Sequence, residues 1–191
     1  LLIVGARRIL VWNIKAEIVI TEFLAESNWY TLPGFKPVFN AVDILSNSNR
    51  LLVSDSEGKV ILFDLNNGKK ILSFDNGSKV KSSRFLEELN LIVTGDIDGY
   101  LKVWDPDNLD QPTKILSGQN SVVSKVRSSP RNGTISVLGE DGKIKIWSTK
   151  TWEILNTIKT NGLVDYADNN YLLISDNSNY VGFYDLKSEL V

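Results

Sequence analysis

Short runs of alternating apolar and polar residues recur along the chain, and each ends on an aromatic side chain. Residues 99–104 and 142–147 are clear examples, and both begin with a glycine. Alternation with a period of two is typical of a β-strand that buries one face. A second β-type run precedes each of these segments, and Gly or Asn between the two predicts a tight hairpin because these residues adopt positive φ readily. The pattern predicts an all-β chain built from repeated hairpins.

The closing aromatics of five such runs set the repeat length. They are Trp12, Phe63, Trp104, Trp147 and Tyr184. Their successive spacings are 51, 41, 43 and 37 residues, and three of the four bracket the ~40–45 residues of a four-stranded propeller blade. The sequence therefore predicts a single repeat region over residues 1–191. Its approximate repeats are 1–23, 38–74, 80–117, 122–158 and 163–191, with an insertion at 24–37.

Several of these positions resemble the WD-repeat family of β-propellers. Trp104-Asp105 is the dipeptide that gives the family its name, and the fourth repeat adds Ser129-Pro130 and Asp141-Gly142 before Trp147. The resemblance covers essentially the whole chain and implies antiparallel four-stranded blades around a central channel. About four and a half blades are present, whereas the family usually closes with about seven, or ~300 residues. Because an open array exposes apolar faces and strand edges, we expect a part of a seven-bladed ring, or completion by a partner.

The chain departs from the family in having no histidine. In the family, a Gly-His pair near the start of each repeat joins a buried polar network with Asp, Ser or Thr, and Trp. We expect this network to be incomplete in every repeat, with a three-member version from Thr94, Asp98 and Trp104 in the third. Residues 77–78 and 118–119 stand at the vacant positions. The blades should then depend more on apolar packing than on polar networks.

The amino-acid composition excludes several kinds of catalytic and metal-binding site. The chain has 21 basic and 23 acidic residues, and no Cys, His or Met. These absences remove the disulfide framework, the zinc ribbon, the thiol nucleophile and the usual general base. The acidic runs 96–99 and 105–108 do not complete a calcium-binding loop. We expect no catalytic residue, no cofactor, no metal site and no small-molecule substrate, and thus no enzyme. An enzyme that uses carboxylates or lysine would instead show clustered carboxylates with perturbed pKa values at the channel mouth.

Three aromatic residues, Trp29, Tyr30 and Phe35, lie in the insertion at 24–37. Large rigid side chains on a loop are typical anchors for a protein partner. The alternative is that the rings fold back and cap the side of the propeller. Both interpretations stay open at the level of sequence.

Arg84 and Arg127 fall at the same position of the predicted inner strands of consecutive repeats, and Asp43 takes that position in the preceding repeat. Some family members that deliver substrates to ubiquitin ligases hold phosphopeptides on arginine-lined faces, so the resemblance implies a phosphate-recognition patch. The alternative is that each arginine pairs with an aspartate of a neighbouring blade. Short basic clusters without an aromatic platform, and a net charge of −2, do not predict direct contact with nucleic acid.

The resemblance implies a non-catalytic protein–protein interaction scaffold that binds proteins or peptides within an intracellular complex, nuclear or cytoplasmic. Two alternatives stay open. One is a substrate receptor of a ubiquitin ligase that recognises phosphorylated or charged peptide motifs, and the other is a ribosome-assembly or RNA-processing subunit. No apolar run approaches the ~18 residues of a membrane helix, so we expect no membrane insertion.

Overall fold

The computed structural model describes residues 2–4, 8–13, 18–24, 38–45, 47–117, 119–129, 133–160, 162, 164–166, 171–175 and 181–186. Most of these residues lie in strands, which form five antiparallel sheets. Within each sheet the strands are neighbours in the order of the chain, so each sheet is a meander. This is the arrangement expected of hairpins that follow one another.

The sheets are numbered as blades 1 to 5 along the chain. Blade 1 contains β1 (Leu2–Val4), β2 (Arg8–Asn13) and β3 (Ile18–Leu24). Blade 2 contains β4 (Phe39–Leu45), β5 (Arg50–Asp55), β6 (Lys59–Asp64) and β7 (Lys70–Asp75). Blade 3 contains β8 (Val80–Leu86), β9 (Leu91–Asp96), β10 (Leu101–Trp104) and β11 (Lys114–Leu116), with the 3-10 helix η1 (Glu87–Leu89) after β8. Blade 4 contains β12 (Val123–Ser128), β13 (Thr134–Gly139), β14 (Lys143–Ser148) and β15 (Ile154–Lys159). Blade 5 contains β16 (Val164–Tyr166), β17 (Tyr171–Ser175) and β18 (Val181–Asp185).

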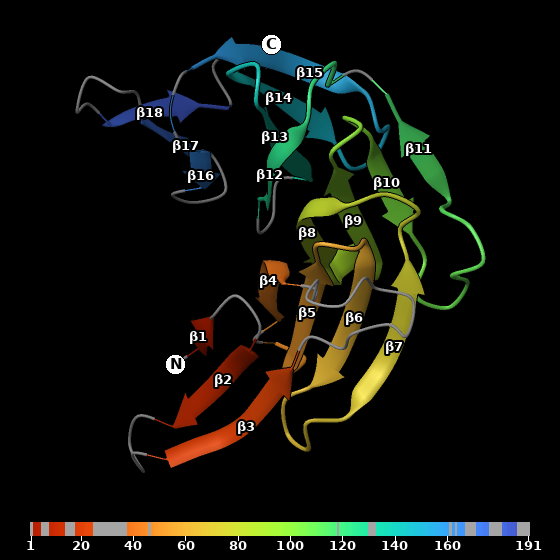
Figure 1. Cartoon of the computed structure of the whole chain (residues 1–191). Helices are drawn as coiled ribbons and strands as arrows, with labels where there is room; N and C mark the ends of the chain where they lie inside the picture. The colour runs from red at the N-terminus through yellow and green to blue at the C-terminus, as the bar shows by residue number, and fades with distance from the viewer. Residues whose placement is uncertain are drawn as a thin grey trace.

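The blades stand side by side along an arc (Figure 1). Strands β4, β8, β12 and β16 lie on the concave side and contact one another in sequence, whereas β7, β11 and β15 lie on the outside. The arc is open between blade 1 and blade 5 (Figure 1). This architecture confirms the predicted all-β propeller with four-stranded antiparallel blades. A seven-bladed ring and the repeat boundaries stay predictions.

The apolar core is divided among the spaces between blades. Four clusters of buried side chains each join one blade to the next. Between blades 2 and 3, Leu62 and Phe74 pack against Ile92 and Trp104, and the Phe74 and Trp104 ring centroids are 4.5 Å apart. Trp147 has the same place between blades 3 and 4. Phe63 and Tyr184 also lie at inter-blade clusters, so the closing aromatics of the second to fifth repeats are inter-blade packing residues, which explains their regular recurrence.

Blade 3 contains a buried polar network around its tryptophan. Trp104 Nε1 donates to Thr94 Oγ1 at 3.0 Å, and Thr94 Oγ1 donates to Asn76 Oδ1 at 2.6 Å. Lys102 Nζ donates to the Asn76 carbonyl at 2.6 Å and lies 3.3 Å from Asp96 Oδ2. The predicted Thr94–Trp104 contact is confirmed. The partner of Thr94 is Asn76 and not residues 77–78, which the sequence placed at the vacant histidine position.

The carboxylate in this network is Asp96, so the prediction of Asp98 is wrong. Asp96 is fully buried at the end of β9, and its Oδ1 accepts the backbone N–H groups of Asp98 and Tyr100 at 3.1 and 2.9 Å. Asp98 lies in the following turn and accepts from Ser78 Oγ at 2.6 Å. Asp96 at the strand end is buried, whereas Asp98 in the turn is exposed.

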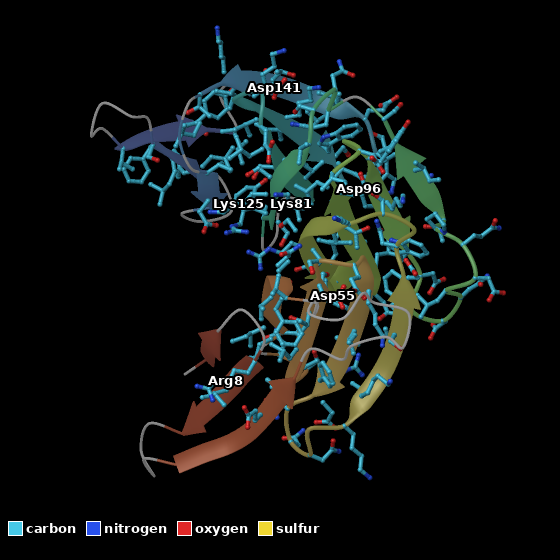
Figure 2. All side chains as sticks on the ribbon, viewed as in Figure 1. Arg8, Asp55, Lys81, Asp96, Lys125 and Asp141 are labelled. Atoms are coloured by element: carbon cyan, nitrogen blue, oxygen red, sulfur yellow. The ribbon has the colours of Figure 1, made fainter. Side chains whose placement is uncertain are left out.

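Aspartates at the strand ends also shape the hairpin turns. Asp55 Oδ1 accepts the backbone N–H groups of Glu57 and Lys59 at 2.9 and 3.0 Å, as Asp96 does one blade further on (Figure 2). Gly99 completes the second of these turns with a φ of 83°, and a Cβ there would lie 2.6 Å from the Ser121 carbonyl oxygen. Glycine is required at this turn for conformation and for space. The acidic runs thus serve the backbone of their own hairpins.

Candidate partner-binding surface

Four charged residues occupy one register position on the inner strands. Asp43, Arg84, Arg127 and Asp165 pair across their sheets with Leu52, Val93, Ser136 and Leu173, respectively. The equivalence of the first three follows from the sequence. Asp165 extends the row to blade 5, and its place was not recognised because β16 is short and poorly patterned. We call these four residues the inner-strand row.

The inner-strand row forms two ion pairs. Arg84 pairs with Asp43, whose other carboxylate oxygen accepts the Phe85 N–H at 3.0 Å. Arg127 Nε lies 3.3 Å from Asp165 Oδ2 in an ion pair without hydrogen-bond alignment. Both arginines also donate to the Val126 carbonyl oxygen, Arg84 through Nε at 3.3 Å and Arg127 through Nη1 at 3.1 Å. Each arginine is thus engaged by an aspartate of a neighbouring blade.

Desolvation affects the titration of this row. Burial raises the pKa of Asp43 above the ordinary value of a carboxyl group, against the opposing attraction of Arg84. Burial, and then repulsion from Arg84, lower the pKa of Arg127, whereas Asp165 opposes both effects. A phosphate group would have to displace a carboxylate from these arginines rather than enter an open site.

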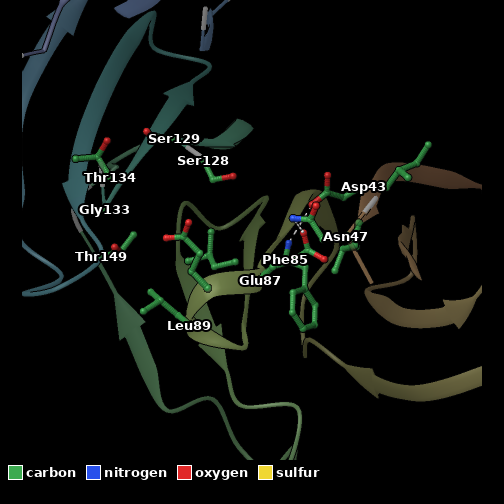
Figure 3. A pocket seen from close by; sticks show the side chains of 14 residues that line it. Asp43, Asn47, Phe85, Glu87, Leu89, Ser128, Ser129, Gly133, Thr134 and Thr149 are labelled. Carbon is green, nitrogen blue, oxygen red and sulfur yellow. Dashed lines mark hydrogen bonds between the residues drawn. The ribbon is translucent and has the colours of Figure 1, made fainter. Parts of the chain in front are cut away.

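Beside the row lies a cavity of 380 Å³ between the turns of blades 2, 3 and 4. We call it the inter-blade groove. Its lining residues are Asp43, Ile44, Leu45 and Asn47 of blade 2, residues 85–89 of blade 3, and Ser128, Ser129, Gly133, Thr134 and Thr149 of blade 4. Figure 3 shows Asp43 and Asn47 on one side of the groove, the hydroxyl side chains of blade 4 on the other, and Glu87 and Leu89 between them.

The helix η1 builds the central wall of the groove. The helix ends at Asn90, which adopts a left-handed conformation with a φ of 51°. The Glu87 carboxylate accepts from Asn47 Nδ2 at 3.1 Å and from Ser48 Oγ at 2.7 Å, which ties the β4–β5 turn to blade 3. Sequence reasoning did not find the groove, because its walls come from three segments far apart in the chain. The acidic pair Glu87-Glu88, in the connection between β8 and β9, was the available signal.

The aromatic anchors predicted from the sequence, Trp29, Tyr30 and Phe35, lie outside the described residues. Their role stays a prediction. Among the residues that the structure does describe, no three acidic side chains gather in a way that would hold a metal ion. The described part of the chain also has no helix of the length and apolarity that crossing a membrane requires.

Stacked four-stranded meanders with their first strands facing a common centre define a β-propeller, here seen as an arc of blades. A sequence model described as "WD domain, G-beta repeat" matches residues 68–105 and 110–148. These two spans are therefore WD repeats. Each matched span runs from the outer strand of one blade through the first three strands of the next, so sequence repeats and blades are offset by one strand.

Three curated relatives match most of the chain. The serine-threonine kinase receptor-associated protein of Dictyostelium discoideum is 24% identical over 83% of the chain and 55% of its own length. The U3 small nucleolar RNA-associated protein 4 of Schizosaccharomyces pombe is 26% identical over 81% of the chain and 24% of its own length. The autophagy-related protein 16 of Arabidopsis thaliana is 31% identical over 70% of the chain and 26% of its own length. The chain therefore spans about half of the first relative and about a quarter of the other two.

Proposed function

We propose that this chain is a non-catalytic interaction scaffold, a propeller part of an intracellular multiprotein complex that binds proteins or peptides. The observation that carries the proposal is that WD repeats fold here into blades joined by apolar cores. A groove lies among the β4–β5, β8–β9 and β12–β13 turns of these blades. Such an arc holds loops from different blades in fixed relative positions. The family is generally a non-catalytic platform. The names of the three relatives describe proteins associated with a kinase receptor, with a small nucleolar RNA and with autophagy, and none of these names is that of an enzyme.

We further propose that another blade covers blade 5. Leu173, Val181 and Phe183 occupy the register positions of Val93, Leu101 and Val103 in blade 3. The blade 3 residues are at most 1% exposed under blade 4, whereas Val181 and Phe183 are 64% and 71% exposed. A blade face of this apolar character is an aggregation hazard in water. Repeat boundaries near 1–23, 38–74, 80–117, 122–158 and 163–191 fit a larger ring of about seven blades.

Two more specific settings follow from the scaffold role. A ribosome-assembly or RNA-processing complex is supported by the name of the fission yeast relative. A ubiquitin-ligase substrate receptor would need Arg84 and Arg127 for phosphopeptides, and their pairing with Asp43 and Asp165 gives this alternative less support.

The test is affinity purification of the full-length protein from native extract, with partners quantified by mass spectrometry. A constant set of stoichiometric partners is expected, and a failure to retain any partner would overturn the scaffold role. In parallel, Trp29, Tyr30 and Phe35 are changed to Ala, and loss of one partner would support their role as anchors. An Arg84→Ala and Arg127→Ala double variant tests the receptor alternative, which is wrong if phosphorylated clients are retained. Thermal unfolding of each variant separates loss of binding from loss of fold.

A further inference from the structure

We propose that the inter-blade groove binds a basic peptide segment of a partner protein, in which an Arg or Lys side chain stands next to an apolar side chain. This inference rests on the proposed scaffold function and specifies the chemistry of its partner. It draws on the charge of the groove, its apolar rim and its size.

Among the described residues, the carboxylates of the groove are not all paired with a cationic side chain. Its described lining contains the carboxylates of Asp43, Glu87 and Glu88 and no Lys or Arg side chain. Asp43 is neutralised by Arg84. Glu87 accepts hydrogen bonds only from the neutral groups of Asn47 and Ser48 among the contacts of the described residues, and these bonds orient the carboxylate without cancelling its charge. Glu88 is exposed, and no described residue forms an ion pair with it. Two acidic groups on one short helix favour a cationic ligand and oppose an acidic one.

Apolar side chains stand next to these carboxylates. Ile44 and Leu89 are 48% and 46% exposed, although both line the groove, and Phe85 and Leu86 are buried in its wall. A Lys or Arg side chain suits such a site, because its alkyl stem packs on apolar surface while its charged end reaches a carboxylate. An apolar neighbour in the peptide would cover Ile44 or Leu89. Exposed aliphatic groups beside acidic ones thus select for both properties together.

The size and the third wall of the groove fit a peptide. A cavity of 380 Å³ lies at the lower end of the ~300–1,000 Å³ of ligand sites, which is room for one or two side chains. The blade 4 wall contributes the hydroxyl side chains of Ser128 and Thr149, which are able to donate to and accept from a peptide backbone. The Glu87 contacts with the β4–β5 turn hold two of the walls together before any ligand arrives. Such a preformed wall lowers the ordering cost of binding.

The experiment measures fluorescence anisotropy of labelled octapeptides with the full-length protein. One probe has a central Arg-Leu pair, and the comparison probes replace this pair by Lys-Leu, Glu-Leu or Arg-Ser. We expect the Arg-Leu and Lys-Leu probes to bind and to weaken as salt is raised, because exposed charge pairs are screened. The Glu-Leu and Arg-Ser probes should bind at least about five-fold more weakly, because each loses the charge contact or the apolar contact.

Matched variants locate the binding site. Glu87→Gln with Glu88→Gln should weaken the Arg-Leu probe about ten-fold and flatten its salt dependence, and Leu89→Ala should weaken it about five-fold. The Gln side chain keeps an acceptor oxygen for Asn47, and its amide nitrogen is able to donate to Ser48 Oγ, so both turn contacts are preserved with the second one reversed in direction. Controls at the opposite strand ends are Glu57→Gln in the β5–β6 turn and Ile97→Ala in the β9–β10 turn, and both should bind the probe as the unchanged protein does.

The outcomes separate this proposal from the scaffold function. If no probe binds, if the Glu-Leu probe binds as well as the Arg-Leu probe, or if the groove variants bind unchanged, the groove proposal is wrong. In the affinity purification, a Glu88→Gln variant that retains every partner would also overturn the groove proposal and leave the scaffold function intact. An unchanged protein that captures no partner would instead overturn the scaffold function itself.

Discussion

Blades 3 and 4 share strand order, register and a buried tryptophan, but they differ in the hydrogen bonding of its indole N–H group. In blade 3, Trp104 Nε1 donates to Thr94. In blade 4, Trp147 is equally buried, and its Nε1 has no hydrogen-bond partner among the described residues. The register explains the difference, because Val137 stands in blade 4 where Thr94 stands in blade 3.

The other positions of the polar network also differ between blades 3 and 4. Gly139 of blade 4 occupies the position of Asp96, and Gln119 stands 18 residues before Val137, as Asn76 does before Thr94. Gln119 Nε2 donates weakly to two backbone carbonyls at 3.3 Å, but its Oε1 has no partner among the described residues. Both blades nevertheless pack on their neighbours with the same apolar positions. Inter-blade packing is thus sufficient for blade 4, and the polar network is an addition in blade 3.

The largest effect is expected from Asp96→Ala. The change removes the ion pair of Lys102 and the acceptor of two turn N–H groups, and loss of one partner of a buried pair costs about 3–5 kcal/mol. The free energy of unfolding in urea measures it. Asp98→Ala is the control and should cost less than about 1 kcal/mol, because it removes one exposed contact with Ser78. Equal losses for the two variants would contradict the distinction between strand end and turn.

A smaller loss is expected from Thr94→Val, which copies blade 4 into blade 3. Trp104 Nε1 loses its acceptor and Asn76 loses a donor, and a buried polar group left unsatisfied costs about 1–3 kcal/mol. Equilibrium unfolding again measures the change. A variant as stable as the unchanged protein would mean that the network contributes nothing and that blade 3 gains only by packing.

The reverse change, Val137→Thr in blade 4, should have the smallest effect. A hydroxyl at this position would accept from Trp147 Nε1, and a typical net hydrogen bond contributes about 0.5–1.5 kcal/mol. We expect a stabilisation in this range. The same substitution in a Trp147→Phe background should bring no gain, because the donor is gone. A gain that persists there would show that the hydroxyl acts through another group.

The hairpins, the repeat length and the equivalence of Arg84 with Arg127 followed from the sequence, because alternation, turn glycines and closing aromatics are local signals. Asp96 and Asp98 could not be told apart, since both lie within one acidic run and only the register decides which of them is buried. Asn76 was missed because the sequence placed the vacant histidine position at residues 77–78, and because asparagine is also common in turns. The inter-blade groove depends on three turns that meet only after the blades have stacked, so no local sequence pattern predicts it.

The one-strand offset between sequence repeats and blades has an evolutionary consequence. The span 110–148 begins with β11, which completes blade 3, and ends with β14 of blade 4. A duplication or loss of one such unit therefore changes the number of blades by one while every sheet keeps its complement of strands. A unit aligned with a whole blade would join its neighbours only through a loop, whereas the offset unit is hydrogen-bonded into two sheets at once. Growth of the array by tandem duplication thus preserves the lateral connection between old and new blades.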